Sequence, residues 1–351
     1  MSHRNTIGLI LLTMVVTLPT TGRSDDQDPT GESEGIEGFE LTGFVDASYS
    51  GNLDMGTDTF GLDQVEIDVI RGFAGDPESK GPHGNGLLRA DLEWVKDGND
   101  WVLSAEQGYL QYTPAFAPRL TFTLGKFNAP IGFELLDPNE IYQFSHALVF
   151  DYALPTNLTG AKVAEQISDR VDVQLYLVNG WDANDLDGAG PKTVGGRGGF
   201  IFPDRAAVGL SVITGDERLH GDRTVVDVDV SVTAVPRLLV GGEFNRGTID
   251  YSPAATAHWT GVLAMAHYDF TDWLGLTGRF DWLDDGDGVV FGDFPQTRTA
   301  FTLAPTLVLG PGMGALFEIR VDSSDEDSFL DPDHKLNGSA TSAAFEMTYS
   351  F

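Results

Sequence analysis

The sequence contains no cysteine, few basic residues and no long apolar stretch after its first two dozen residues. Without cysteine, the chain cannot form disulfides, use a thiol for chemistry or carry an acylated cysteine anchor. The formal net charge is −32, with 53 acidic residues against 21 basic ones, which excludes nucleic acid as a partner because its phosphates would be repelled. The apolar stretch of about 18 residues that a transmembrane helix needs is also missing.

The N-terminal residues have the pattern of a secretory signal. Residues 7–18 form an apolar run that follows a basic start and precedes small residues. This run is too short to span a bilayer comfortably and has the flanks of a signal peptide. We therefore predict a signal peptide over 1–23, an acidic flexible leader over 24–38 and a single folded domain over 39–351.

From residue 39 onward, runs of residues alternate between apolar and polar side chains. In 226–233 every even position is valine and every odd position is polar. A period of two places the two sets on opposite faces of a strand. The polar face carries full charges in mid-strand, among them Glu66, Asp227 and Arg279. A soluble sandwich would also alternate, but a wide membrane barrel turns such charges toward a water-filled lumen and its apolar face toward lipid.

The connections and the chain end also favour a barrel. Short turns such as 235–237 alternate with longer polar stretches such as 284–297, as periplasmic turns alternate with outer loops. The chain ends in an amphipathic strand, 345–351, whose terminal Phe351 we expect the barrel-assembly machinery to bind. Aromatic residues near strand ends are expected to form interfacial girdles: Trp94, Trp181, Trp259, Tyr268, Trp273, Trp282 and Tyr349.

These patterns predict an all-β fold, a transmembrane antiparallel up-and-down β-barrel of about 16 strands, with about 14 to 18 left open. The expected strands are 39–49, 60–71, 86–96, 102–113, 119–128, 159–167, 171–180, 193–202, 206–214, 223–234, 237–247, 258–270, 272–283, 297–309, 312–321 and 338–351. Glu106 and Glu165 break the alternation in two of them, and the connection 72–85 is too long for a periplasmic turn.

The connection that follows 119–128 is far longer than the usual length of about 4–6 residues. It is rich in aromatic and apolar side chains, so we predict that it packs inside the barrel as the third outer loop. Acids on this loop and basic residues on the wall would set a transverse field at the narrowest point. The predicted constriction comprises Glu134, Asp137, Glu140 and Asp151 with Lys126, Arg89, Arg279, Arg298 and Arg320. Strict alternation turns Lys126 outward unless the ladder breaks near Gly125. Unrelated, solvated charges are the alternative.

Several segments resemble the OmpL-like putative β-barrel porins of bacterial outer membranes. They are the opening strand 43–49, the segment 124–134, the loop segment 145–150, the return at 159–160 and the strand end at 178–182. The resemblance implies a porin-like barrel over essentially the whole mature chain. It names no substrate and brings no catalytic residues.

The predicted function is that of an outer-membrane porin, which gives passive diffusion of small hydrophilic solutes or ions. The overall acidity predicts cation preference. The expected partners are outer-membrane lipid, these solutes and the assembly machinery, and a homotrimer is left open. No cofactor, metal ligand or catalytic residue is predicted. The Asp-rich segments 182–188 and 284–288 lack the full spacing and the distal glutamate of a calcium loop, so we interpret them as solvated turns.

Two other classes of function remain as alternatives. One is a structural or adhesive barrel with a plugged lumen, which would not conduct. The other is an outer-membrane hydrolase. Ser145 and His146 are neighbours, but neighbours in a strand point to opposite faces, and His267 with Asp269 fits a lumen hydrogen bond better than a catalytic dyad. The sequence has no Gly-x-Ser-x-Gly motif.

Overall fold

The computed structural model describes residues 38–351, apart from 76–82, 99, 185–190, 204, 217–220, 252–254 and 293. The predicted signal peptide, 1–23, and the leader up to residue 37 lie outside the described residues. Within the described part of the chain, no helix is long and apolar enough to cross a membrane.

Sixteen strands form one closed barrel in which every pair of neighbours is antiparallel, as the alternating pattern predicts. They are β1 (Glu40–Asn52), β2 (Thr57–Phe73), β3 (Gly84–Asp97), β4 (Asp100–Pro114), β5 (Leu120–Asn128), β6 (Asn157–Ser168), β7 (Val171–Val178), β8 (Thr193–Phe202), β9 (Ala206–Asp216), β10 (Asp222–Val235), β11 (Leu238–Asp250), β12 (Thr256–Asp269), β13 (Leu274–Asp285), β14 (Gln296–Gly310), β15 (Met313–Ser324) and β18 (Ser339–Ser350). A small hairpin that the alternation did not predict, β16 (Phe329–Leu330) with β17 (Leu336–Asn337), lies in the last loop.

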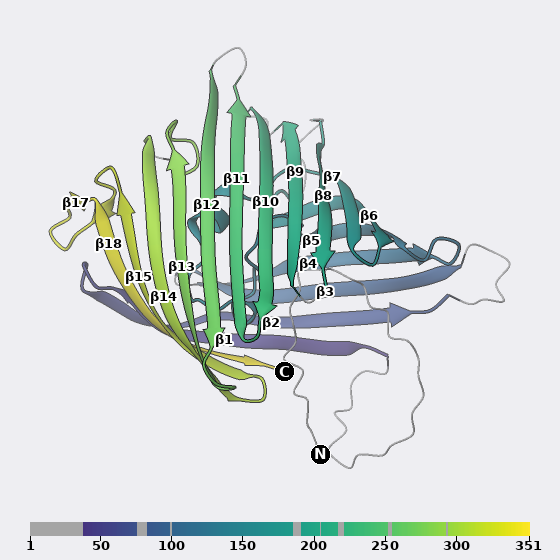
Figure 1. The fold of residues 1–351 in the computed structure, drawn as a ribbon, viewed down its shortest axis with the longest axis horizontal. Helices are drawn as coiled ribbons and strands as arrows, with labels where there is room; N and C mark the ends of the chain where they lie inside the picture. Colours follow the sequence, from purple (N-terminus) through teal and green to yellow (C-terminus); the bar gives the residue numbers. More distant parts are fainter. Residues whose placement is uncertain are drawn as a thin grey trace.

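The barrel closes where the first strand meets the last. β1 pairs with β18 in a register that sets Phe44 opposite Ser350. The ladder runs to the last residue, because the Phe351 N–H donates to the Gly43 carbonyl at 3.0 Å. The described N-terminal end of β1 and the chain's C-terminus therefore lie at the same end of the barrel, which we call the turn end; the opposite end is the loop end (Figure 1).

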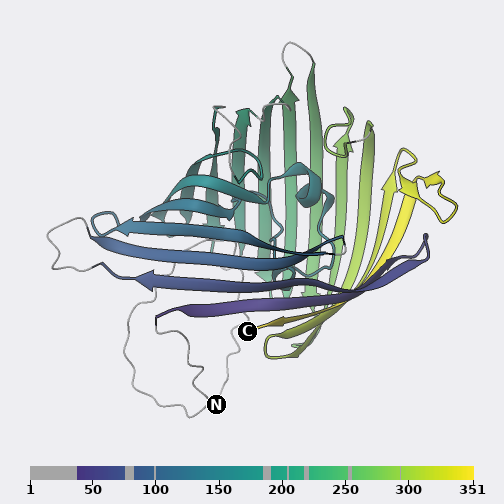
Figure 2. The same cartoon turned by 180° about the vertical axis from the view of Figure 1, so that it is seen from behind.

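The strands are strongly tilted. In Figures 1 and 2 the purple and blue strands β1 to β4 cross the view almost at right angles to the green strands β10 to β13 on the opposite wall. A closed barrel whose strands tilt by roughly 35–45° shows its two walls crossed in this way. A barrel of about sixteen strands is also wide enough to leave a space at its centre.

The two faces of the wall have opposite character. Outward side chains are apolar and exposed, such as Leu124 at 65% and Leu175 at 63% of full exposure, whereas the inward Asp227 and Arg279 are 0% and 1% exposed. A protein whose apolar residues lie outside and whose charges lie inside suits a surrounding of lipid. Aromatic pairs mark the turn end of the outer face, where Phe200 meets Phe202 and Tyr268 meets Phe270.

Two sequence expectations are wrong in detail. Trp259 does not belong to a girdle, because it faces inward and is 1% exposed. The regular alternation of short and long connections also fails for the first four strands. The loop-end connections 53–56 and 98–99 are short there, and the turn-end connection between β2 and β3 is the longer one, with 76–82 outside the described residues. In this part of the wall the strands are long and the loop-end connections are short; β2 alone has 17 residues.

Candidate constriction site in the barrel lumen

The connection between β5 and β6, residues 129–156, turns into the barrel and is called the lumen loop below. Its two ends are pinned together, because the Ala129 N–H donates to the Thr156 carbonyl at 2.8 Å. Asp182, after β7, accepts the N–H groups of Thr156 and Asn157 at 2.8 Å each. The loop therefore leaves the wall from a rigid base. The helix α1 (Leu148–Ala153) lies within the ring of strands (Figure 2).

The first limb of the lumen loop is held by carboxylates on the opposite wall. The Gly132 N–H donates to Asp227 Oδ1 on β10 at 3.2 Å, and the Phe133 N–H donates to Glu243 Oε2 on β11 at 2.7 Å. Gly132 has a φ of +89°, and a Cβ there would collide with Leu154. A glycine is required at this point for both reasons. Backbone donors that enter a closed space are thereby satisfied by the wall.

Arg279 on β13 holds the middle of the loop. Its Nη1 donates to Glu134 Oε1 at 2.7 Å and to the Ser145 carbonyl at 2.6 Å, and its Nη2 donates to the His146 carbonyl at 3.0 Å. Its Nε also donates to Asp281 Oδ2, at 3.1 Å. A guanidinium with these partners is planar, fully engaged and almost entirely buried. The predicted pair of a loop acid and a wall arginine is present, but it acts as a clamp on the loop.

Glu134 is ionised in this clamp. Burial alone would raise its pKa, but the Arg279 guanidinium, the nearby His146 and the Ala147 N–H together lower the pKa of Glu134 to about 2. Ala147 donates to Glu134 Oε2 at 2.7 Å, so both carboxylate oxygens have partners. The negative charge therefore persists under all ordinary conditions and keeps the clamp closed.

β15 supplies a second clamp beside the first. Glu318 Oε2 accepts the N–H groups of Phe144 at 2.9 Å and Ser145 at 3.2 Å. Arg320 Nη1 donates to the His146 carbonyl at 2.6 Å while its Nε is held by Asp322. The three predicted residues Glu134, Arg279 and Arg320 are thus brought together.

The helix α1 is held by apolar packing instead of charge. Val149 is fully buried and belongs to one apolar cluster with the inward Trp259 and Leu283. A Cβ on Gly261 of β12 would collide with Val149, so this glycine admits the helix to the wall. The inner face of the barrel is therefore apolar in this region, whereas elsewhere it carries the charges that the sequence analysis placed there.

Within the described part of the chain, a cavity lies on each side of the lumen loop. The larger, of about 400 Å³, opens toward the turn end below Phe133 and Tyr142 and is lined by Lys162, Arg197 and His267 among others. The second, of about 380 Å³, lies toward the loop end and is lined by strand ends of β1, β2 and β18 together with Phe144, Ser145 and Glu318. The lumen loop lies between them, with Phe133 and Tyr142 lining the first cavity and Phe144 and Ser145 lining the second.

The loop tip faces the wall made by β1 to β4. It begins at Asp137 and includes the one-turn 3₁₀ helix η1 (Pro138–Glu140), which touches β1 and β18. Burial, Glu106 and Glu140 together raise the pKa of Asp137 to about 9. Glu140 is exposed, and the nearest predicted cation on this side is Arg89, whose Nε donates to Asp91 at 2.8 Å. Acidic groups dominate this face.

Asp151, exposed on α1, lies within electrostatic reach of Arg320 and Arg279 and is therefore beside the clamp. Two other predicted residues lie apart. Arg298 lies over the Phe291 ring at 4.1 Å, near the loop end of the barrel. Lys126 is not in the lumen: β5 runs unbroken through Gly125, and Lys126 Nζ donates to the Ala105 carbonyl at 2.8 Å. The alternation itself had predicted this orientation.

Sequence reasoning missed the role of the wall carboxylates. Asp227 was expected to face inward, and it does, as does Glu243. Their use as acceptors for loop N–H groups follows only from tertiary contacts. Carboxylates of the Asp-rich turns also accept backbone N–H groups. Asp285 Oδ1 accepts the Val289 N–H at 2.7 Å, in line with the interpretation of 284–288 as a turn.

The residues considered for a hydrolase have other partners. The Ser145 Oγ lies 3.2 Å from Arg279 Nη2, and the His146 Nδ1 lies 3.5 Å from Glu134. His267 is held by Thr277 at 2.8 Å and by Asp269 at 3.1 Å, and its ring stacks on Tyr142. His267 is therefore part of the lumen hydrogen bonding.

The comparisons with known proteins agree with this geometry. The family model described as putative beta-barrel porin-2, OmpL-like, matches residues 63–351. The outer membrane channel DcaP of Acinetobacter baumannii superposes with a TM-score of 0.68 at 10% identity, over 89% of this chain and 97% of that chain. Comparison with curated proteins finds no match in sequence.

Two further solved structures are similar in fold. The anion-selective porin from Comamonas acidovorans gives a TM-score of 0.65 at 12% identity, over 89% of this chain and 99% of that one. The trimer form of OmpT from Vibrio cholerae gives 0.62 at 12% identity, with 89% and 99% covered. At such identities the likeness concerns the barrel fold alone.

Proposed function

Since this chain belongs to the OmpL-like family of beta-barrel porins, which are outer-membrane proteins, we propose that it is a narrow, cation-preferring diffusion channel whose filter is the lumen loop. Small hydrophilic solutes and ions would pass between the loop tip and the wall of β1 to β4. The matching family is described as a porin family, which favours a channel over a structural barrel without an open pore and over a hydrolase.

The observation that carries the proposal is the anchoring of the lumen loop between two cavities. Arg279, Arg320 and Glu318 fix its middle, and Asp227 and Glu243 fix its first limb. A loop held by this many charge-assisted bonds narrows the lumen at a constant place. A filter of this kind selects by width and by the charges that remain free beside it.

The free charges on the open side support cation preference. Arg279 and Arg320 are paired with carboxylates and loop carbonyls, so their positive charges contribute little to the electrostatic potential along the proposed passage. The loop tip carries the exposed Glu140, whereas Asp137 is neutral near pH 7 because its pKa is raised to about 9. The facing wall carries several carboxylates, and its cation Arg89 is paired with Asp91. A lining of predominantly one sign raises the local concentration of the opposite ion.

Reversal potentials across planar bilayers in a KCl gradient test the ion preference. With chelator present to remove divalent cations, we expect K⁺ to be more permeant than Cl⁻. Glu140→Gln should lower the ratio of K⁺ to Cl⁻ permeability, because Glu140 is an exposed acid of the loop tip. Glu326→Gln is the matched control, since Glu326 is exposed in the last loop and lines neither cavity.

Clear Cl⁻ selectivity of the wild-type channel would refute the preference. Absence of any conductance in a folded barrel would favour the structural, plugged alternative over the channel. Swelling of liposomes with sugars of graded size would then measure how wide the passage is.

Assembly is proposed on separate grounds. The apolar outer face contacts outer-membrane lipid, and the terminal Phe351 is the proposed site of recognition by the barrel-assembly machinery. A homotrimer is proposed because OmpT of Vibrio cholerae has a trimer form of the same fold. Native mass measurement in mild detergent tests it, and a monomer at all protein concentrations would contradict it.

A further inference from the structure

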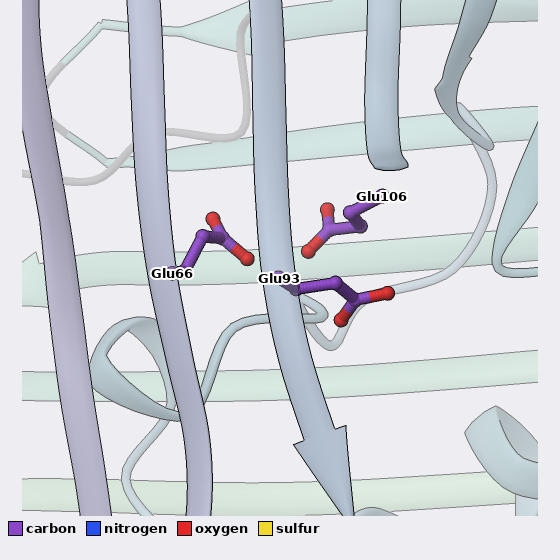
Figure 3. A group of neighbouring side chains, drawn as sticks. All are labelled: Glu66, Glu93 and Glu106. Atoms are coloured by element: carbon purple, nitrogen blue, oxygen red, sulfur yellow. The ribbon is translucent and has the colours of Figure 1, made fainter. Parts of the chain in front are cut away.

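Three glutamates from adjacent strands meet on the inner face of the wall opposite α1. Glu66 comes from β2, Glu93 from β3 and Glu106 from β4, and one carboxylate oxygen of each lies within 4.8 Å of the others. Figure 3 shows Glu66 and Glu106 reaching toward one another from the two sides of β3, with Glu93 rising from β3 itself. We call this group the glutamate triad.

A β-bulge places Glu106 in the triad. The register between β3 and β4 shifts so that Asp91 pairs with Gln107 and Leu92 pairs with Ala105, which leaves Glu106 without a partner in the ladder. Glu106 and Gln107 consequently both face inward, at 1% and 2% exposure. Bulges often re-aim a side chain at a functional site. The break in alternation at Glu106 in the sequence is therefore the trace of this bulge.

The triad has only neutral hydrogen-bond donors in the described part of the chain. Gln64 Nε2 donates to Glu66 at 3.2 Å and to Glu93 at 3.3 Å, Ser104 donates to Glu93, and Asn128 Nδ2 donates to Glu106 at 3.0 Å. No described lysine, arginine or histidine forms an ion pair with any of the three. The neighbouring Asp91, by contrast, is neutralised by Arg89.

Two oxygens of the triad are buried without any partner. They are Glu66 Oε1 and Glu106 Oε2, and both residues are 1% exposed. Grouping like charges away from bulk water is costly unless a counter-charge satisfies them. A bulge that adds a third carboxylate to such a place, and leaves its oxygen unpartnered, therefore calls for a positive ligand, either a bound cation or a proton shared between carboxylates.

We propose that the glutamate triad binds a divalent cation of the hard, oxygen-preferring class, with Ca²⁺ as the best fit. Three carboxylates can supply three to six oxygens, and water in the lumen can complete the six to eight ligands that Ca²⁺ takes. Oxygens bound at about 2.3–2.6 Å from one ion lie up to about 5 Å apart, which the triad satisfies. The absence of sulfur and imidazole from the triad disfavours Zn²⁺ and Cu²⁺.

Gln64 is suited to assist. Its amide already spans Glu66 and Glu93, and rotation of the terminal amide by half a turn would offer Oε1 in place of Nε2 to a cation. The cation would tie β2, β3 and β4 together through their side chains. It would also lie next to the loop tip, where Asp137 has an unpartnered Oδ1 near Glu106.

The test is direct titration of the refolded full-length barrel in detergent with CaCl₂ at constant ionic strength. We expect one saturable site with a dissociation constant of about 10⁻⁴–10⁻³ M, the range of weak, extracellular calcium sites. Glu106→Gln and Glu66→Gln should each weaken binding by about tenfold or more, since ligand charge sets the affinity. Glu165→Gln, with the same change on an exposed outward residue, should bind as the wild type does.

Heat-modifiable migration in gels confirms that each variant is folded, and if one glutamine variant does not fold, the other decides. Absence of saturable Ca²⁺ binding by the wild-type barrel would overturn the proposal, and would mean that the carboxylates share protons instead. Unchanged affinity in a folded Glu106→Gln or Glu66→Gln barrel would overturn it too. Binding is measured without conductance, so the result does not depend on the proposed channel.

Discussion

Replacing Arg279 with methionine should release the lumen loop while leaving the barrel intact. Methionine keeps much of the side chain's volume but removes every donor of the guanidinium. Glu134 then loses its only bond from a fixed cation, and the carbonyls of Ser145 and His146 lose their donors. The ladders of β13 with its neighbours are unaffected, because they are made by backbone groups.

The magnitude follows from the burial of the pair. Arg279 and Glu134 are 1% and 9% exposed, and removing one partner of a buried pair costs about 3–5 kcal/mol. Since about 1.4 kcal/mol is a tenfold change in an equilibrium, the ratio of docked to undocked loop should fall by roughly two to four orders of magnitude. Even a well-docked loop would then open measurably.

Single-channel recording in planar bilayers is the assay. We expect larger and noisier conductance in Arg279→Met, and faster swelling of liposomes with larger sugars. Arg237→Met is the matched control, because Arg237 pairs with Asp272 on an exposed turn and such pairs contribute little. An Arg279→Met channel with wild-type conductance and size limit would refute the view that Arg279 holds the filter.

Three further predictions follow from the same contacts. The loop's docking should weaken in acid, because the pKa of Glu134 is lowered from its ordinary 4.5 to about 2; this stabilisation is complete above about pH 4.5 and is lost as the pH falls through about 2. Channel noise should rise in that window in the wild type, and a flat response would contradict the assignment. Gly132→Ala should also loosen the loop, because its φ is +89° and a Cβ meets Leu154; conductance compared with Gly56→Ala, a positive-φ glycine with open space, measures this. Deletion of Phe351 should reduce the folded fraction in outer membranes by removing the last bond to Gly43, and an unchanged fraction would argue against it.

The strand pattern was predictable because each strand separates two solvents. Valines 226 and 228 face outward and Asp227 faces inward for the same reason, so period two reveals the strand directly. The inner face near Trp259 was not predictable, because there the inward residues pack against α1 and are apolar or small, whereas the outward His258 and Thr260 are polar. The alternation at this point therefore suggests the reverse of the true orientation.

The site was predictable as a location and only partly as a set of residues. Its loop was found from length and apolar content, and Glu134, Arg279 and Arg320 do meet. The sequence could not show which arginines hold the loop and which do not, because this depends on how the loop crosses the lumen. Glu106 was visible only as an irregularity, because a bulge and an ordinary misplaced charge look alike in a sequence.

The anchors of the lumen loop have a consequence for the order in which the protein matures. Asp227, Glu243, Arg279 and Glu318 all come from strands that follow the loop in the chain. Pairing of β5 with β6 alone therefore gives the loop nothing to dock against. The loop can take its place in the lumen only once the strands from β10 to β15 have joined the barrel.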